Sequence, residues 1–187
     1  MKKVLILHGT DASPKDNWFT WLKGKLIGQG YTVWLPQLPQ SDQPNARTYT
    51  KFILSNDTFV IDTETIIIGH SSGAVEILSL LQALPDDAQI KAAFLVSAFK
   101  DDLGWEALKD LFKTPFDYEA IKSKCQEFIL VHSDDDPYVP LEQAEYLAER
   151  LDGELIVMEG QGHFNTELSP DYVKFPELFE IIKSVVR

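Results

Sequence analysis

The chain has 187 residues, of which 44% are hydrophobic and 25% charged, with 11 Phe, 6 Tyr and 4 Trp. This composition excludes a disordered or low-complexity chain, and the length favours one domain that spans residues 1–187. Seventeen basic and 29 acidic residues give a net charge of −12, which argues against nucleic acid or an anionic membrane as a partner. The excess lies in residues 101–187, which hold 8 basic and 20 acidic residues, whereas residues 1–100 hold 9 of each.

In chain order, short apolar runs alternate with stretches of helical periodicity. Because the runs show no polar alternation, they predict parallel strands that are covered on both faces by helices, and hence an α/β fold. The least regular part, residues 98–124, is expected to form a rim or a small cap. Strands are predicted at 3–8, 32–35, 65–68, 92–97, 127–132 and 155–158, and helices at 17–28, 74–84, 141–151 and 176–186.

The cysteine content and the N-terminus bear on the cellular compartment. The single cysteine, Cys125, excludes an intramolecular disulfide and fits a reducing environment. The first apolar stretch, residues 4–7, is too short for a signal peptide, and no apolar run reaches the length of a membrane span. We therefore expect a cytoplasmic protein.

Residues 69–73 read Gly-His-Ser-Ser-Gly between the third predicted strand and the next helix. The pattern Gly-x-Ser-x-Gly in this context is typical of a nucleophile elbow, a sharp turn that projects a serine hydroxyl above the sheet. The alternative is an ordinary turn in which Ser71 or Ser72 caps the helix. The flanking strand and helix favour the first interpretation, so Ser71 is the predicted nucleophile.

A serine hydroxyl needs a base to remove its proton, and the chain offers four histidines. Only His163 lies in a loop after the last predicted strand and downstream of every candidate acid, the order that Ser-Asp-His hydrolases of this class require. We therefore predict that His163 is the base. For the acid, residues 134–136 offer three aspartates, of which Asp136 is favoured by the Val-Pro pair that follows it, and Asp134 is the alternative.

Stabilisation of the developing oxyanion needs two backbone N–H donors. The residue after the nucleophile, Ser72, is expected to provide one. The second is expected from the loop after the first strand, at Thr10 or alternatively at Asp11.

Aromatic residues near the loops that follow strands are candidates for a substrate pocket. These candidates are Phe99, Phe116, Phe164 and, less favoured because it lies on an amphipathic helix, Trp18. The chain has no His-Glu-x-x-His, no paired Cys-x-x-Cys and no Gly-x-Gly-x-x-Gly, so we expect neither a metal nor another cofactor.

Taken together, these residues resemble the small serine hydrolases of the retinoblastoma-binding protein nine and YdeN type, in the α/β-hydrolase superfamily. The likeness covers nearly the whole chain, at residues 17–22 in the first helix, 36–39, 65–74, 95–98, the Asp-Asp-Pro turn at 135–137 and Gly-His-Phe at 162–164. It implies a three-layer α/β-hydrolase core with about six mostly parallel strands in the order 2-1-3-4-5-6. It also implies cofactor-independent cleavage of a carboxylic ester or related small acyl substrate, with Ser71, Asp136 and His163 as the triad.

The chain departs from this family at one segment. The mammalian member is named for binding the retinoblastoma protein through Leu-x-Cys-x-Glu, and here residues 60–64 read Val-Ile-Asp-Thr-Glu. That interaction is therefore not expected. A catalytically silent protein-interaction module on the same fold remains the alternative function, although all three triad residues are present. The acidic second half predicts that polyanionic substrates are disfavoured and that neutral or cationic ones are tolerated.

Overall fold

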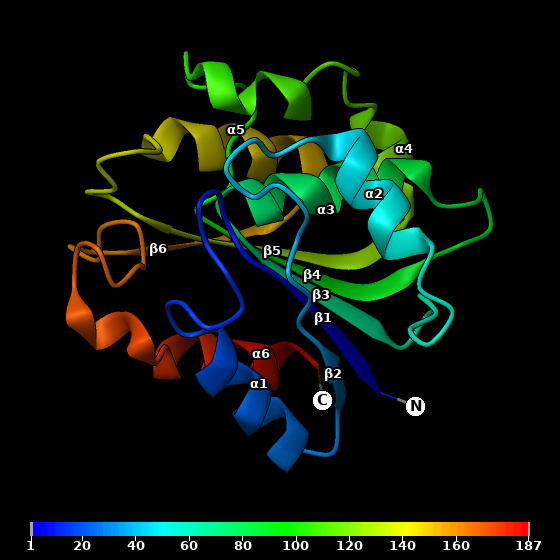
Figure 1. Cartoon of the computed structure of the whole chain (residues 1–187), viewed down its shortest axis with the longest axis horizontal. Coiled ribbons are helices and arrows are strands. Elements are labelled where there is room, and N and C mark those ends of the chain that lie inside the picture. Colours follow the sequence, from blue (N-terminus) through cyan, green and yellow to red (C-terminus); the bar gives the residue numbers. More distant parts are fainter. Residues whose placement is uncertain (1, 187) are drawn as a thin grey trace.

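A six-stranded sheet runs through the centre of the computed structural model, which describes residues 2–186 (Figure 1). All neighbouring strands pair in parallel, in the order β2-β1-β3-β4-β5-β6, which confirms the predicted topology. The strands are β1 (Lys3–Leu7), β2 (Thr32–Trp34), β3 (Thr65–His70), β4 (Ile90–Val96), β5 (Cys125–Ser133) and β6 (Glu154–Met158).

Helices cover both faces of this sheet. On one face lie α1 (Phe19–Gly28) and α6 (Pro176–Val185), which appear below the strands in Figure 1. The other face carries α2 (Ala46–Leu54), α3 (Ser72–Ala83), α4 (Tyr118–Ser123) and α5 (Leu141–Leu151). Two 3-10 helices, η1 (Glu106–Leu111) and η2 (Pro170–Val173), complete the described elements.

The core consists of two apolar layers, one on each side of the sheet. Alternate residues of a strand enter different layers: Leu5 packs on the α3 side, whereas Val4 and Ile6 pack on the α1 side. Every residue of β3 is buried, as the unbroken apolar run predicts. The edge strands β2 and β6 contain no buried residue, so the expectation that all six strands are covered on both faces is wrong for these two.

The structure adds elements that the apolar periodicity did not indicate. Helix α2 begins after Asn45, whose side-chain Oδ1 accepts the amide of Thr48 at 3.0 Å, and its buried face is formed by Tyr49 and Ile53. Residues 98–124 contain η1 and α4. These helices are short, and tertiary burial of a few residues in each stabilises them.

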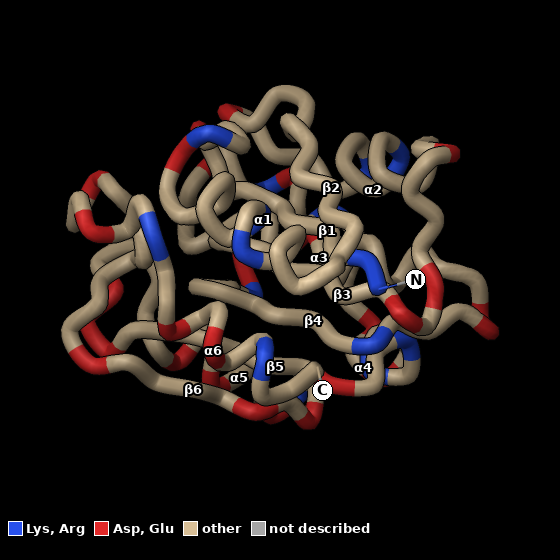
Figure 2. The backbone as a smooth tube through the Cα atoms, turned by 90° about the horizontal axis from the view of Figure 1, so that it is seen from below, with Lys and Arg blue, Asp and Glu red and all other residues tan. Residues whose placement is uncertain are grey.

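Because the strands are parallel, their carboxyl ends meet at one edge of the sheet, and the loops that follow β1, β3, β5 and β6 gather there. Figure 2 shows acidic positions along the part of the chain that carries α5 and β6, in agreement with the acidic second half of the sequence. None of the helices within residues 2–186 combines the length and the apolar character of a membrane span.

Candidate active site

Ser71 occupies a strained turn between β3 and α3. Its backbone dihedrals are φ 55° and ψ −125°, a region that non-glycine residues rarely adopt, and its amide donates to the Val96 carbonyl at 2.8 Å. The two glycines of the turn are required by space. A Cβ on Gly69 would lie 2.5 Å from the Gly73 carbonyl oxygen, and one on Gly73 would lie 2.5 Å from that of Leu7. The local sequence thus permits a turn that brings α3 directly onto the sheet.

His163 and Asp136 form a close pair. The His163 Nδ1 lies 2.7 Å from Asp136 Oδ2, and the carboxylate is completely enclosed. Its other oxygen, Oδ1, accepts the amides of Tyr138 at 2.9 Å and Val139 at 3.0 Å. Burial by itself would raise the pKa of Asp136, but the His163 side chain and these two amides outweigh it, so the pKa lies below its ordinary value. The carboxylate is therefore ionised and fixed in orientation.

The other two aspartates of the turn have different partners. Asp134 Oδ1 accepts the Gly160 amide at 2.8 Å, and Asp135 Oδ1 accepts the Gly162 amide at 2.7 Å. Both bonds support the backbone of the loop that carries His163. The structure thus brings Asp136, and not Asp134, to the imidazole.

The loop after β1 lies next to the serine turn. Thr10 Oγ1 donates to Ser72 Oγ at 2.9 Å, so the two residues that are expected to provide oxyanion donors are tied together. The amide of Asp11, the alternative donor, is already engaged because it donates to the Ser41 carbonyl at 2.9 Å. A Cβ on Gly9 would lie 3.0 Å from the Cβ of Ser71, so this loop approaches the serine closely.

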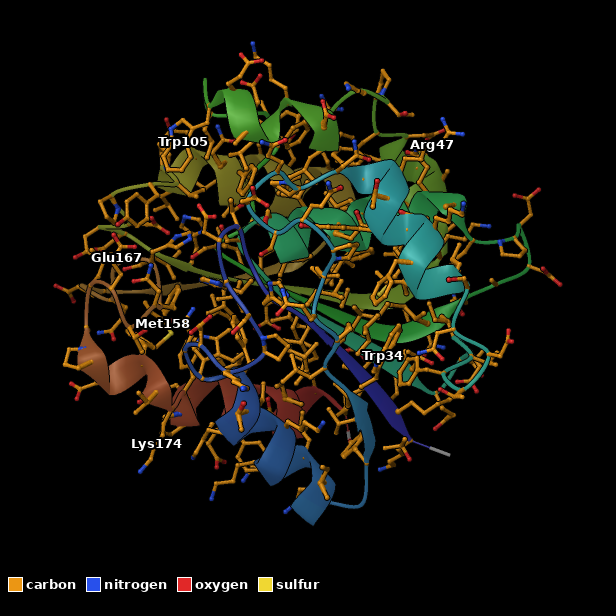
Figure 3. The ribbon with its side chains drawn as sticks, in the orientation of Figure 1. Trp34, Arg47, Trp105, Met158, Glu167 and Lys174 are labelled. Atoms are coloured by element: carbon orange, nitrogen blue, oxygen red, sulfur yellow. The ribbon has the colours of Figure 1, made fainter. Side chains whose placement is uncertain are left out.

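Two cavities meet at Ser71 and His163, and we call them the apolar arm and the acidic arm. The apolar arm has a volume of about 270 Å³, and its lining includes Phe99, Leu103, Trp105, Leu108, Tyr138 and Val139. The acidic arm has a volume of about 220 Å³, and its lining includes Asp16 and Asn17, whereas Asp11 and Glu167 border both arms. Trp105 and Glu167 both lie at the end of the sheet where the strands terminate (Figure 3).

Of the four aromatic residues predicted to line a pocket, only Phe99 does so at this site. Phe116 lines a separate cleft between α2 and α3. Phe164 is fully buried and its ring stacks on Phe175 at a centroid distance of 5.0 Å. Trp18 is also fully buried, in the layer between α1 and the sheet. The prediction of pocket contact is therefore wrong for these three residues, because Phe164 and Trp18 pack in the core and Phe116 lines a different cleft.

Sequence reasoning missed Tyr138 and Glu167, which come from loops after two different strands. The Tyr138 ring lies edge-on to the His163 ring at a centroid distance of 5.1 Å and an angle of 88°. A hydrogen bond to Glu167 contributes, after burial, to a raised pKa of the Tyr138 hydroxyl. The only local signal for Tyr138 is its position between the predicted acid Asp136 and the Val-Pro pair.

The remaining histidines are buried and bond to the backbone. His8 Nε2 accepts the Leu38 amide at 3.0 Å, and the His132 Nε2 lies 2.8 Å from the Val139 carbonyl oxygen. The His70 Nε2 lies 2.8 Å from the carbonyl oxygen of His163. Burial lowers the pKa of all three imidazoles. His163 is thus the histidine that both pairs with a carboxylate and faces the cavities that contain Ser71.

Comparisons with known proteins extend over nearly the whole chain. It is 34% identical to serine hydrolase RBBP9 of Rattus norvegicus, over 98% of this chain and 95% of that protein. It is 28% identical to the putative hydrolase YdeN of Bacillus subtilis (strain 168), again over 98% and 95%. The crystal structure of the B. subtilis ydeN gene product matches with a TM-score of 0.90 at 27% identity, over 99% of this chain and 98% of that chain.

A more distant structure shares the fold alone. Est1E from Butyrivibrio proteoclasticus, solved with ferulic acid bound, has a TM-score of 0.72 at 16% identity, over 100% of this chain and 90% of that chain.

The family model described as serine hydrolase matches residues 4–184, which include the serine turn and the His163–Asp136 pair. This chain is therefore a hydrolase with the α/β-hydrolase fold and belongs to the serine hydrolase family.

Proposed function

We propose that this hydrolase cleaves a small carboxylic ester or related acyl substrate through an acyl-enzyme on Ser71. The observation that carries the proposal is the 2.7 Å contact between His163 Nδ1 and the enclosed carboxylate of Asp136, beside cavities that both Ser71 and His163 line. Ser-His-Asp chemistry needs this arrangement: a carboxylate that fixes the tautomer of the histidine, and a histidine that faces the serine.

The reaction follows from these positions. The Nδ1–H group of His163 donates a hydrogen bond to Asp136, which leaves a lone pair on Nε2. This lone pair accepts the Ser71 hydroxyl proton as Oγ attacks the acyl carbon. The tetrahedral oxyanion accepts hydrogen bonds from the backbone N–H groups of Ser72 and Thr10. The leaving alcohol takes the proton from His163. Water, activated in turn by His163, then attacks the acyl-enzyme and releases the acid and free Ser71.

The two arms support a substrate with one apolar part and no large negative charge. The apolar arm suits an aliphatic or aromatic group, whereas Asp16 in the acidic arm and Asp11 and Glu167 at the border of both arms repel an anion. We therefore expect kcat/KM at low salt to be lower for an anionic ester than for a neutral ester of the same size. Equal values for the pair would contradict this part of the proposal. Amide hydrolysis and acyl transfer would use the same residues, so a matched amide belongs in the same assay.

The decisive experiment is labelling of the purified protein with a fluorophosphonate probe, which reacts with activated serines. We expect the wild-type protein and a Ser79→Ala control to be labelled, because Ser79 lies on α3 away from the turn, and we expect no labelling of Ser71→Ala. Equal labelling of wild type and Ser71→Ala would overturn the role of Ser71. No labelling of the wild type, together with no hydrolysis of short esters, would favour the non-catalytic interaction module.

A further inference from the structure

The loop that carries His163, here called the base loop (residues 160–165), has an unusual backbone. Three of its residues have positive φ: Gly160 at 68°, Gly162 at 58° and Phe164 at 51°. Phe164 is the only one of the three with a side chain, so its backbone is strained and must be held by its surroundings. The position of the His163 imidazole therefore depends on what holds this loop.

The amides of the base loop are held from the end of β5 and the turn that follows it. Asp134 and Asp135 accept the amides of Gly160 and Gly162, and Ser133 Oγ accepts that of Gln161 at 2.8 Å. These contacts orient the first half of the loop. They do not reach the carbonyls that follow the His163 side chain.

Those carbonyls are held by two buried side chains from other elements. The Nε2 of His70, at the end of β3, lies 2.8 Å from the His163 carbonyl oxygen. Trp18 Nε1, from the residue that precedes α1, donates to the next carbonyl, that of Phe164, at 3.0 Å. His70 is 3% exposed and Trp18 is 0% exposed, so water does not compete for either bond.

The chemistry of His70 fits a permanent donor. A carbonyl oxygen only accepts, so the nitrogen that faces it carries the proton. Burial lowers the pKa of His70 to about 3, which leaves a neutral imidazole with its proton on Nε2. Its ring also packs against that of His163 at a centroid distance of 4.8 Å. Since His70 precedes Ser71 in the chain, one residue links the serine turn to the base loop.

We propose that His70 and Trp18 are positioning residues whose N–H groups hold the consecutive carbonyls of His163 and Phe164 and so fix the imidazole between Asp136 and Ser71. This inference rests on the proposed function. His70 borders the acidic arm, but neither side chain hydrogen-bonds to the Ser71 side chain or to the His163 ring, so both act through the base loop. Loss of either donor lets the loop relax and misplaces the base, which lowers the rate of the chemical step more than the affinity for substrate.

Conservative variants separate the donors from the packing. Trp18→Phe keeps an aromatic ring against Phe19 and Phe175, removes the indole N–H and leaves a small cavity where the second ring was. His70→Phe removes the imidazole donor, whereas His70→Gln keeps an N–H group at a position close to that of Nε2. Trp21→Phe is the matched control, because Trp21 lies in the helix that Trp18 precedes and packs on Phe179.

The test measures kcat and KM with a p-nitrophenyl ester, and the rate of fluorophosphonate labelling, at equal folded concentration. We expect Trp18→Phe and His70→Phe to lower kcat and the labelling rate by about tenfold or more, with KM within about twofold of wild type. His70→Gln should recover most of the loss, and Trp21→Phe should match wild type.

Two outcomes would overturn the inference: wild-type kcat in Trp18→Phe, or an equal loss of kcat in His70→Gln and His70→Phe. If His70→Phe does not fold, Trp18→Phe and His70→Gln decide by the same criteria. The result is independent of the failure of the proposed function, which would appear as labelling of Ser71→Ala or as an unlabelled wild-type protein.

Discussion

The base loop and the segment 98–124, here called the rim segment, both border the Ser71 cavities, but they are held in different ways. The base loop is fixed by hydrogen bonds with the side chains of Trp18, His70 and Asp134, which come from three separate segments. The side chains of Trp18 and His70 are buried. The rim segment packs through a small apolar cluster that includes Phe99, Leu108 and Leu111. Three of its ion pairs join residues three apart at the surface. Hydrogen bonds with the side chains of Asn45, Gln82 and Gln143 also tie it to neighbouring elements.

This difference indicates a division of labour. Directional bonds define where His163 sits, and an error there changes the chemical step. Apolar packing defines the shape of the apolar arm and tolerates change in the substrate group that it accommodates. Variants of the base-loop side should therefore act on kcat, and variants of the rim segment should act on KM and acyl-chain preference.

The largest effect is expected at the carboxylate that orients the base. Asp136→Asn replaces an ionised acceptor with an amide that does not hold the His163 tautomer, and we expect kcat to fall by about 10⁴-fold. The control is Asp134→Asn, whose amide oxygen can still accept the Gly160 N–H, so its kcat should stay close to wild type. A greater loss in Asp134→Asn would exchange the roles of the two residues.

A second prediction addresses the rim segment. Leu108 is 3% exposed and lines the apolar arm, so Leu108→Ala should enlarge the arm and destabilise the fold by about 2 kcal/mol. KM should rise several-fold for long acyl esters, while kcat for an acetyl ester stays near wild type. Leu54→Ala, at an exposed position of α2, is the control. A fall in kcat for the acetyl ester equal to that for the long ester would remove the division between the two regions.

The parts of this site that were predictable have contiguous signals. Ser71 was found because a nucleophile turn needs glycines and defined flanks within five residues, and His163 because its order in the chain excluded three other histidines. The structure brings both to the same cavities, with Asp136 beside His163. The order of the six strands was predictable because unbroken apolar runs indicate parallel strands and the resemblance supplied the order.

The rest depends on contacts between segments that are distant in sequence. Trp105, Tyr138 and Glu167 converge only when the loops after β4, β5 and β6 are placed together. Pocket contact of Trp18 was predicted wrongly, because its place at the start of an amphipathic helix does not reveal whether the indole faces a cavity or a carbonyl. Helix α2 was missed because it is only nine residues long, so its buried positions Tyr49 and Ile53 make a short periodic signal.

A third prediction uses pH to compare two buried carboxyl groups, Glu76 near the rim segment and Asp136 beside the base loop. Glu76 is fully buried on α3, next to Val75, which packs against the rim segment, and Thr50 donates to its Oε1 at 2.7 Å. Burial raises the pKa of Glu76 well above its ordinary value, and the Thr50 bond only partly opposes this. The folded protein thus keeps a proton that the unfolded chain loses above about pH 4.3.

The sign follows from proton linkage. Between the unfolded and folded pKa values, Glu76 lowers the free energy of unfolding by about 1.4 kcal/mol for each pH unit. Glu76→Gln should therefore be more stable than wild type at pH 7, and the gain should vanish near pH 4, as measured by denaturant unfolding. Asp136 behaves in the opposite way: its lowered pKa contributes stability above about pH 3.9, which is lost as the pH falls through the folded value. Glu159→Gln, at an exposed position, is the control; an equal pH-dependent gain there would contradict the assignment to Glu76.

The smallest effect is expected at the surface ion pairs of the rim segment. Lys109 Nζ lies 2.5 Å from Glu106 Oε2, but the two side chains are 52% and 86% exposed, so solvent screens the attraction and ordering them offsets much of the gain. Lys109→Ala should leave Tm, kcat and KM unchanged within error in both low and high salt. A clear loss of Tm at low salt only would show that ion pairs, and not the cluster around Leu108, hold this segment. Because Lys109 and Leu108 are adjacent in η1, the two variants test the surface and the buried side of one helical turn, and the difference between them measures how far packing alone shapes the apolar arm.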